Sequence, residues 1–304
     1  MSTGTGKVCD MTTVPDRHAL LHLAPLPRGD ARWALVWAAG IGVMWLWDLM
    51  FLNAPAFAQV RLALFNSLLG GALVVVFSML FGWGSALLMD ALEQRGVRSV
   101  YLVLTFLFDL IRSIPQIVGI LLGDVVMTAF IIEGSLRSPL LQLILMSMAV
   151  SLFVFLEVMD LIRERIDHYR KLDFVDAMLC CGIPMQRIIN VEILRKNSAA
   201  HLVHKAVAVF GMAIFLQCSI DFIISVGLST DVSSANFPVT LGSLLARMDS
   251  KQDILAIGLT LADPSYLGAL MTRHLQGLTV AATIIFTLIC THYVANGMVR
   301  RYRL

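Results

Sequence analysis

Six long apolar stretches restrict the possible folds of this chain more than any other feature of its sequence. Each is about 20 residues or longer, which is the length of helix that crosses the hydrocarbon core of a bilayer. A single segment can satisfy its backbone hydrogen bonds in lipid only as a helix. The stretches are Trp33–Leu52, Leu62–Met89, Val100–Ile132, Pro139–Ile162, Leu202–Val226 and Leu278–Val299. We therefore expect an all-α integral membrane protein with six transmembrane helices.

The composition supports this class and argues against binding of nucleic acid. Hydrophobic residues make up 58% of the 304 residues and charged residues only 14%, whereas soluble domains carry about 25% charged residues. The net charge is +2, and no block of like charges marks a nucleic-acid surface. This composition predicts a protein that is surrounded by membrane lipid.

Motifs for catalysis and for metal binding do not occur in the sequence. The five cysteines show neither CxxC spacing nor a histidine at zinc-like distance, so we expect small apolar packing residues and no metal site. Gly4-Thr5-Gly6-Lys7 resembles the end of a phosphate-binding loop, but Met1 and Val8 stand where that loop needs Gly and Ser or Thr. H-E-x-x-H and G-x-S-x-G are also missing. We expect a protein that is not an enzyme, without catalytic residues and without a cofactor bound by this chain.

The distribution of Lys and Arg predicts the orientation in the membrane. With the N-terminus inside, the cytoplasmic segments hold sixteen of these residues and the external segments five. We expect a multi-pass protein of the cell (inner) membrane with both termini cytoplasmic. Residues 1–32 form a cytoplasmic tail, residues 33–61 the first transmembrane helix and a short external loop (Asn53–Arg61), and residues 62–304 the main transmembrane domain.

The third apolar stretch is too long for one straight span. Asp109, Arg112 and Pro115 interrupt it, so we expect its first turns to lie at the interface and the span to begin near Ser113. Asp109 and Arg112 are spaced i,i+3, which favours a local ion pair. The segment Ile254–Met271 is split by a proline, and we interpret it as an external interfacial stretch.

The segment between the fourth and fifth spans predicts a helix, a glycine and a second helix on the cytoplasmic side. Alternating charges suggest that the fourth helix continues beyond the membrane, with Arg163 and Asp167 paired at i,i+4. Apolar residues at helical spacing follow (Leu172, Val175, Met178 and Leu179). Gly182 suits the end of this helix, and Pro184 suits the start of the next one. A second apolar face follows with Ile188, Ile189, Ile193 and Leu194.

This segment resembles the "EAA" loop of the permeases of type I ATP-binding-cassette importers. The resemblance lies in Asp176-Ala177-x4-Gly182 followed by Ile193-Leu194. Three further segments are similar to that family in order and spacing: "IRSIPQIVGILL", "SIDFIISVGLS" with "VTLGSLLARMDSKQDIL", and the C-terminal "GLTVAATIIFTLICTHYVANGMVRRYRL". Together they cover residues 62–304 and resemble the second, "C-type" permease of the dipeptide/oligopeptide/nickel class. Asp176 stands where the family has Glu, and the family's long external loop is missing.

The resemblance implies a function and a set of partners. The coupling loop (about 163–197) would dock on a separate ATPase through Asp176, Ala177, Gly182, Arg187 and Ile193. ATP would therefore act through two ATP-binding subunits. A second permease would complete the pathway as a heterodimer, and an external solute-binding protein would deliver a peptide or a related small solute. Cys180 and Cys181 fall at variable positions of this loop, which favours a packing role.

Ionisable residues within the apolar stretches support an alternative hypothesis. A charge at membrane depth is costly, and such residues often mark ion or substrate pathways. Asp124 and Asp221 are the candidates for a pathway. They could also carry ion or proton coupling in a self-sufficient secondary transporter or channel. For His201, His204 and Lys205, at the start of the fifth span, we expect side chains that extend to the interface.

Overall fold

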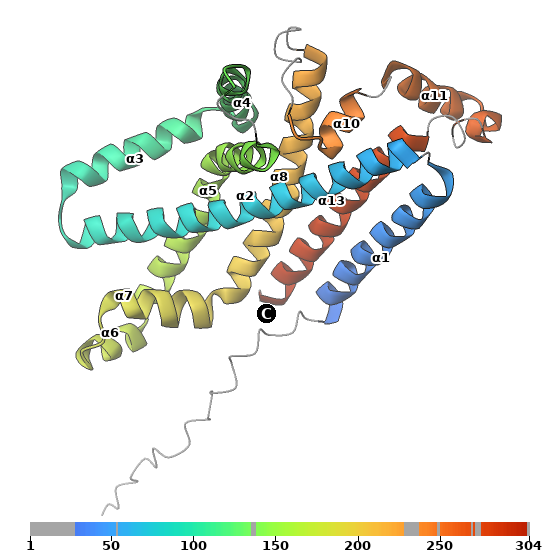
Figure 1. Ribbon diagram of the computed structural model, residues 1–304. Coiled ribbons are helices and arrows are strands. Elements are labelled where there is room, and N and C mark those ends of the chain that lie inside the picture. Colours follow the sequence, from blue (N-terminus) through green and yellow to red (C-terminus); the bar gives the residue numbers. More distant parts are fainter. Residues whose placement is uncertain are drawn as a thin grey trace, which may run out of the picture.

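A computed structural model shows an all-α protein. It describes residues 28–52, 54–134, 138–227, 237–247, 250–268, 270 and 275–302, and within these ranges it contains helices and no strand. The helices are α1 (Arg28–Phe51), α2 (Ala54–Gln94), α3 (Arg98–Ser113), α4 (Gln116–Ile132), α5 (Pro139–Arg170), α6 (Asp173–Cys180), α7 (Met185–Arg187), the π-helix η1 (Ile188–Asn197), α8 (Ala199–Gly227), α10 (Leu241–Arg247), α11 (Ser250–Ala262), the 3₁₀ helix η2 (Pro264–Tyr266) and α13 (Leu275–Tyr302). Figure 1 shows their arrangement.

Four helices in the described ranges are long and apolar enough to cross a membrane, namely α1, α2, α5 and α8. The α3–α4 pair makes a fifth if the two are counted as one bent span. These helices suggest a membrane-spanning protein. The sixth predicted span falls in α13, where the described apolar part, Thr279–Val294, is shorter than a full span. Helix α11 has 13 residues, too few to cross a bilayer.

Helix α2 is longer than predicted. It has 41 residues, which corresponds to about 60 Å. The predicted external loop Asn53–Arg61 is wrong, because α2 already begins at Ala54. Pro55 explains this start, since proline is well accommodated in the first turn of a helix.

The interruption of the third apolar stretch is confirmed. Helices α3 and α4 are bent by 94° relative to each other at Ser113–Pro115. Ile114, the residue before the proline, has an extended backbone (φ −82°, ψ 125°), as expected from the clash of a proline ring with a preceding helical residue. The bend leaves α4 as a short apolar arm that packs against α5 and α8.

The main hydrophobic core lies where α2, α5 and α8 meet, and η1 contributes to it. Val154 and Val158 of α5 are fully buried there. A second, smaller cluster joins α2, α10 and α13. Helix α1 packs mainly on α13, where Trp33 stacks on Tyr293 with ring centroids 4.4 Å apart.

Polar contacts join the C-terminal half of α5 to its neighbours. Lys205 of α8 pairs with Glu157 at 2.7 Å, a partner that the sequence did not indicate. Arg112 pairs with Asp109 at 3.8 Å, as predicted, and also with Asp160 of α5 at 2.7 Å.

Two further arginines of α5 contact other helices. Arg163 donates a hydrogen bond to the Tyr101 hydroxyl at 3.1 Å and also interacts electrostatically with Asp167. Arg170 pairs with Asp90 of α2. These contacts fix the end of α5 before the chain enters α6.

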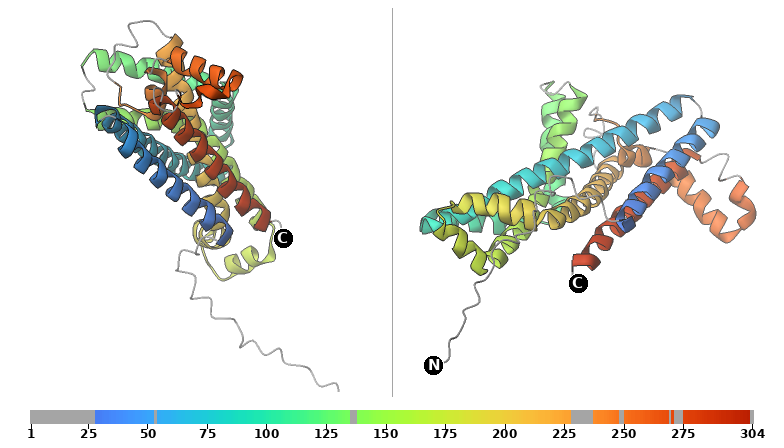
Figure 2. Two further views of the ribbon diagram at one scale, coloured as in Figure 1. Left: turned by 90° about the vertical axis from the view of Figure 1, so that its right-hand side faces the viewer. Right: turned by 90° about the horizontal axis from the view of Figure 1, so that it is seen from below.

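The loop between α5 and α8 and the segments predicted to be external lie at opposite ends of the helix assembly. In Figures 1 and 2 (left), α6 lies on the same side as the start of α1 and the end of α13, while α10 and α11 lie on the opposite side. The segments predicted to be cytoplasmic therefore gather at one end of the helix assembly.

Candidate functional site

The predicted helix–glycine–helix geometry is present between α5 and α8. Helix α6 ends in a Schellman motif, in which the Gly182 N–H binds the Leu179 carbonyl at 2.9 Å and the Ile183 N–H binds the Met178 carbonyl at 3.2 Å. Gly182 has φ +80°, a conformation that costs other residues about 1–2 kcal/mol. Pro184 then caps α7, since its carbonyl accepts hydrogen bonds from the N–H groups of Arg187 and Ile188.

The second helix of the loop is wider than an α-helix. Residues Ile188–Asn197 form a π-helix, which is rare and often found at functional sites. The buried residues Ile188 and Ile193 are five positions apart, and so are Ile189 and Leu194. This spacing matches the i→i+5 bonding of a π-helix, so the sequence did contain a signal for it.

The structure divides the five predicted coupling residues into two groups. Asp176, Ala177, Gly182 and Arg187 are exposed, so they can contact another molecule. Ile193 is fully buried in the main core, where it anchors the loop and cannot form part of its surface.

Helix α6 has an inner and an outer face. Val175 is buried, and Phe174 and Met178 pack beside it against the core. On the outer face, Leu172 and Leu179 are 40% and 43% exposed, with exposed Asp176 between them at i+4 and i+7 spacing. An amphipathic helix with an apolar outer rim is therefore available at this end of the molecule.

The cysteine prediction is corrected for two of the five residues. Cys180 and Cys181 are free and exposed at the end of α6, so they are not packing residues. Their position explains this, because the inner face of α6 is already occupied by Val175 and its neighbours. Cys290 is buried, as predicted, and Cys9 lies outside the described residues.

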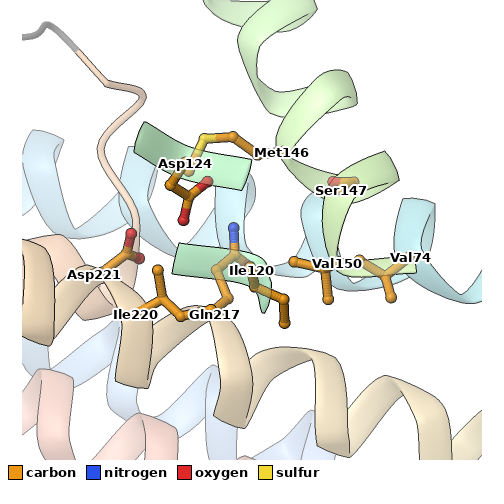
Figure 3. A pocket seen from close by; sticks show the side chains of 9 residues that line it. All are labelled: Val74, Ile120, Asp124, Met146, Ser147, Val150, Gln217, Ile220 and Asp221. Carbon is orange, nitrogen blue, oxygen red and sulfur yellow. The ribbon is translucent and has the colours of Figure 1, made fainter. Parts of the chain in front are cut away.

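A small buried cavity brings together the two predicted pathway carboxylates. Its lining comes from α2, α4, α5 and α8: Val74, Ile120, Asp124, Met146, Ser147, Val150, Gln217, Ile220 and Asp221. Figure 3 shows the side chains of Asp124, Gln217 and Asp221 converging from α4 and α8. The structure therefore places Asp124 and Asp221 in one site, as neighbours.

The two carboxylates have different surroundings. Asp221, 7% exposed, accepts a hydrogen bond from the Thr240 hydroxyl. Asp124 is 3% exposed, and its carboxylate receives no hydrogen bond from any described residue; only its main-chain carbonyl is bonded, by Thr128 at 2.8 Å. Asp221 also interacts electrostatically with Asp124. The Asp124 carboxyl group is thus buried without a hydrogen-bond donor within the described chain.

Two glycines make room for the polar groups of this cavity. A Cβ atom at Gly70 would lie 3.1 Å from the Gln217 side-chain nitrogen, and one at Gly242 would lie 2.9 Å from an Asp221 carboxylate oxygen. Gly70 thus lets α2 approach the amide of Gln217, while Gly242 lets α10 approach Asp221.

Thr240 is positioned by the start of α10. Its main-chain N–H binds the Ser243 hydroxyl at 2.9 Å, and the Ser243 N–H binds the Thr240 hydroxyl at 3.2 Å. The Leu241 N–H binds the Ser67 hydroxyl of α2 at 2.9 Å. Sequence reasoning missed Gln217 and Thr240, because a neutral polar residue in an apolar stretch carries little signal by itself.

The described residues contain no group of three or more His, Cys, Asp or Glu side chains that could hold a metal ion. Carboxylate, amide and hydroxyl oxygens are nevertheless close together in the cavity, and such ligands suit hard cations.

Comparisons with known proteins leave the family open. No family model matches the chain, and a search of curated proteins finds no match.

Proposed function

We propose that this chain is the permease subunit of an ATP-binding-cassette importer, with six transmembrane helices and both termini in the cytoplasm. The observation that carries the proposal is the exposed helix–glycine–helix loop between α5 and α8. A second permease subunit completes the pathway. Two ATP-binding subunits supply energy through the loop, and an external binding protein delivers a peptide or a related small solute.

The surface of the loop supports docking on a partner. Leu172 and Leu179 expose apolar surface on either side of Asp176, and a helix with such a face fits a hydrophobic groove. Ala177 is exposed beside them, and its small side chain allows a partner to approach the helix backbone. Arg187 is exposed on the next helix and supplies a positive charge for an acidic partner surface.

The base of the loop supports transmission of force. Val175, Ile188 and Ile193 are 0–1% exposed, so both helices of the loop are packed on the main core. The Trp83 indole N–H of α2 also binds the Asn190 side-chain oxygen at 3.1 Å. Packed protein interiors have low compressibility and transmit displacement, so a push on α6 is carried to α5 and α8.

The test is a pull-down of the tagged protein from its native membranes in mild detergent, with mass spectrometry of the retained proteins. The test variant is Gly182→Trp, and its matched control is Gly96→Trp. Gly96 also closes a helix in a Schellman motif, with φ +68°. Within the described chain, a Cβ at either glycine would have no heavy atom within 4 Å. Both variants therefore carry the same backbone strain and the same exposed indole.

We expect the wild type and Gly96→Trp to retain an ATP-binding subunit and a second permease, and Gly182→Trp to lose the ATP-binding subunit alone. Wild-type protein that retains neither partner would contradict the proposal. That result would favour a self-sufficient secondary transporter or channel that uses Asp124 and Asp221, because such a protein needs no ATPase.

A further inference from the structure

We infer that the cavity between α2, α4, α5 and α8 is a binding site for one small alkali-metal cation, held by Asp124 and Asp221 with oxygen from Gln217. The inference does not depend on the proposed function, since it concerns binding by this chain alone. It rests on the burial of the cavity and on the chemistry of its lining.

The first step is the environment of Asp124. Its side chain is 3% exposed and points into the cavity (Figure 3), and it receives no hydrogen bond from the described residues. Buried polar groups in folded proteins are hydrogen-bonded, and buried charges are paired or bind metals. Among the described residues that line the cavity there is no Lys, Arg or His. A cation from outside the chain would supply the partner that the Asp124 carboxylate lacks.

The second step is the set of available ligands. Two carboxylates, the amide of Gln217 and the hydroxyl of Ser147 line the same space, and all of them carry hard oxygen atoms. Figure 3 shows the Gln217 amide nitrogen on the side of the carboxylates, and rotation of the amide by 180° would present its oxygen. The Ser147 hydroxyl already donates to the Leu143 carbonyl at 2.8 Å, which leaves its oxygen lone pairs free to bind a cation. Among the described lining residues, the thioether of Met146 is the single soft ligand, and no imidazole or thiol of the kind that selects zinc is present.

The third step is the charge of the cation. Asp221 already accepts the Thr240 hydroxyl, whereas Asp124 lacks such a donor among the described residues. The carboxylate that lacks a hydrogen-bond donor is thus Asp124, and one positive charge placed between the two carboxylates also relieves their mutual repulsion. A monovalent ion meets this need.

The fourth step is the position in the fold. Asp124 lies on α4, the second arm of the helix pair that bends by 94°. Ion sites in transport proteins often lie on discontinuous helices, where neighbouring segments can move relative to each other. Gly70 and Gly242 let α2 and α10 pack closely beside Gln217 and Asp221, which holds these side chains at the cavity.

The experiment measures binding of ²²Na⁺ to the purified full-length protein in detergent, together with its thermal stability. Choline chloride at equal ionic strength replaces sodium chloride in the reference, and Li⁺ and K⁺ serve as competitors. The test variant is Asp124→Asn, which keeps the shape and removes the charge. The control is Asp109→Asn on α3, whose side chain is 63% exposed and lies outside the cavity.

We expect saturable binding of one Na⁺ per chain in the wild type and in Asp109→Asn. The Tm should rise by about 3 °C when the Na⁺ concentration reaches roughly ten times the dissociation constant. Asp124→Asn should lose the binding and the Tm response. Asp221→Asn should raise the Na⁺ dissociation constant at least tenfold, with a correspondingly smaller rise in Tm at the same Na⁺ concentration.

Two results would overturn the inference. One is a wild-type protein that binds no ²²Na⁺ and has the same Tm in sodium, lithium, potassium and choline salts. If that protein is instead stabilised only by lower pH, the two carboxylates share a proton and the site is not a metal site. The other is unchanged Na⁺ binding in Asp124→Asn, which would place the ion elsewhere.

Discussion

The contact between α2 and α5 gives the sharpest prediction, because two glycines of α2 differ only in what lies beside them. A Cβ at Gly82 would lie 2.7 Å from Val158 Cβ, 2.8 Å from Val158 Cγ1 and 3.0 Å from the Met159 main-chain nitrogen. A Cβ at Gly84 would meet no heavy atom within 4 Å in the described chain. Gly82→Ala and Gly84→Ala are therefore a test variant and its matched control.

The size of the effect follows from these distances. Carbon atoms at their best separation lie about 3.5–4.0 Å apart, so the new methyl group at position 82 is too close by nearly 1 Å. Rotation of the Val158 side chain cannot move its Cβ, and a β-branched residue has little freedom in a helix. The helices must separate, which costs about 1–3 kcal/mol. Because both variants gain the same helix propensity, their difference isolates this steric cost.

The assay is reversible unfolding of the purified protein in mixed micelles, with the fraction of SDS increased and circular dichroism as the signal. We expect Gly82→Ala to be less stable than Gly84→Ala by about 1–3 kcal/mol. Equal stability of the two variants, or a more stable Gly82→Ala, would show that α2 and α5 do not approach each other at this position and would refute the packing described above.

Three further predictions concern an ion pair, the turn at Gly182 and the exposure of two cysteines. Asp90→Ala leaves Arg170 without its partner at a site where Asp90 is 9% exposed, so we expect the free energy of unfolding to fall by about 2 kcal/mol. Lys196→Ala, at the exposed pair with Glu192, should lower it by less than about 0.5 kcal/mol. Similar losses for the two variants in SDS unfolding would contradict this. Gly182→Val should destabilise the protein by about 1–2 kcal/mol because residue 182 has a positive φ. Gly182→Asn should destabilise it clearly less, since Asn tolerates this conformation at helix ends. Equal destabilisation by the two variants in the same assay would disprove the conformational explanation. In a Cys9→Ala background, which removes the cysteine of the predicted cytoplasmic tail, a membrane-impermeant maleimide should label exposed Cys180 and Cys181 in inverted vesicles but not in right-side-out vesicles. The Cys9→Ala/Cys180→Ala/Cys181→Ala variant is the unlabelled control, and labelling in right-side-out vesicles alone would reverse the topology.

The long helices were predictable because their signal is local. Runs of apolar residues gave α1, α2, α5 and α8, and a proline after a charged pair gave the bend between α3 and α4. The same reasoning failed at Asn53–Arg61, where the mixed composition predicted a loop. A helix already formed can extend beyond its apolar part at little cost, as α2 does at its start.

Contacts between helices were harder to predict, because the sequence does not say which helices are neighbours. Gly182 and Pro184 predicted the turn between the two helices of the loop, because the conformational preferences of glycine and proline act locally on the backbone. The pairing of Lys205 with Glu157 requires that α8 pack on α5 in one register. The meeting of Asp124 and Asp221 requires the same of α4 and α8, and only the folded chain supplies that information.

The exposed loop and the buried cavity are built on the same two helices. Helix α5 contributes Ser147 to the cavity and leads directly into α6, while α8 contributes Gln217 and Asp221 and begins directly after η1. About 33 Å of continuous helix separates the start of α8 from Asp221. A partner that displaced α6 and η1 would therefore move both helices, and with them two walls of the cavity. By linkage, an ion that prefers one spacing of α5 and α8 would in turn favour one position of the loop.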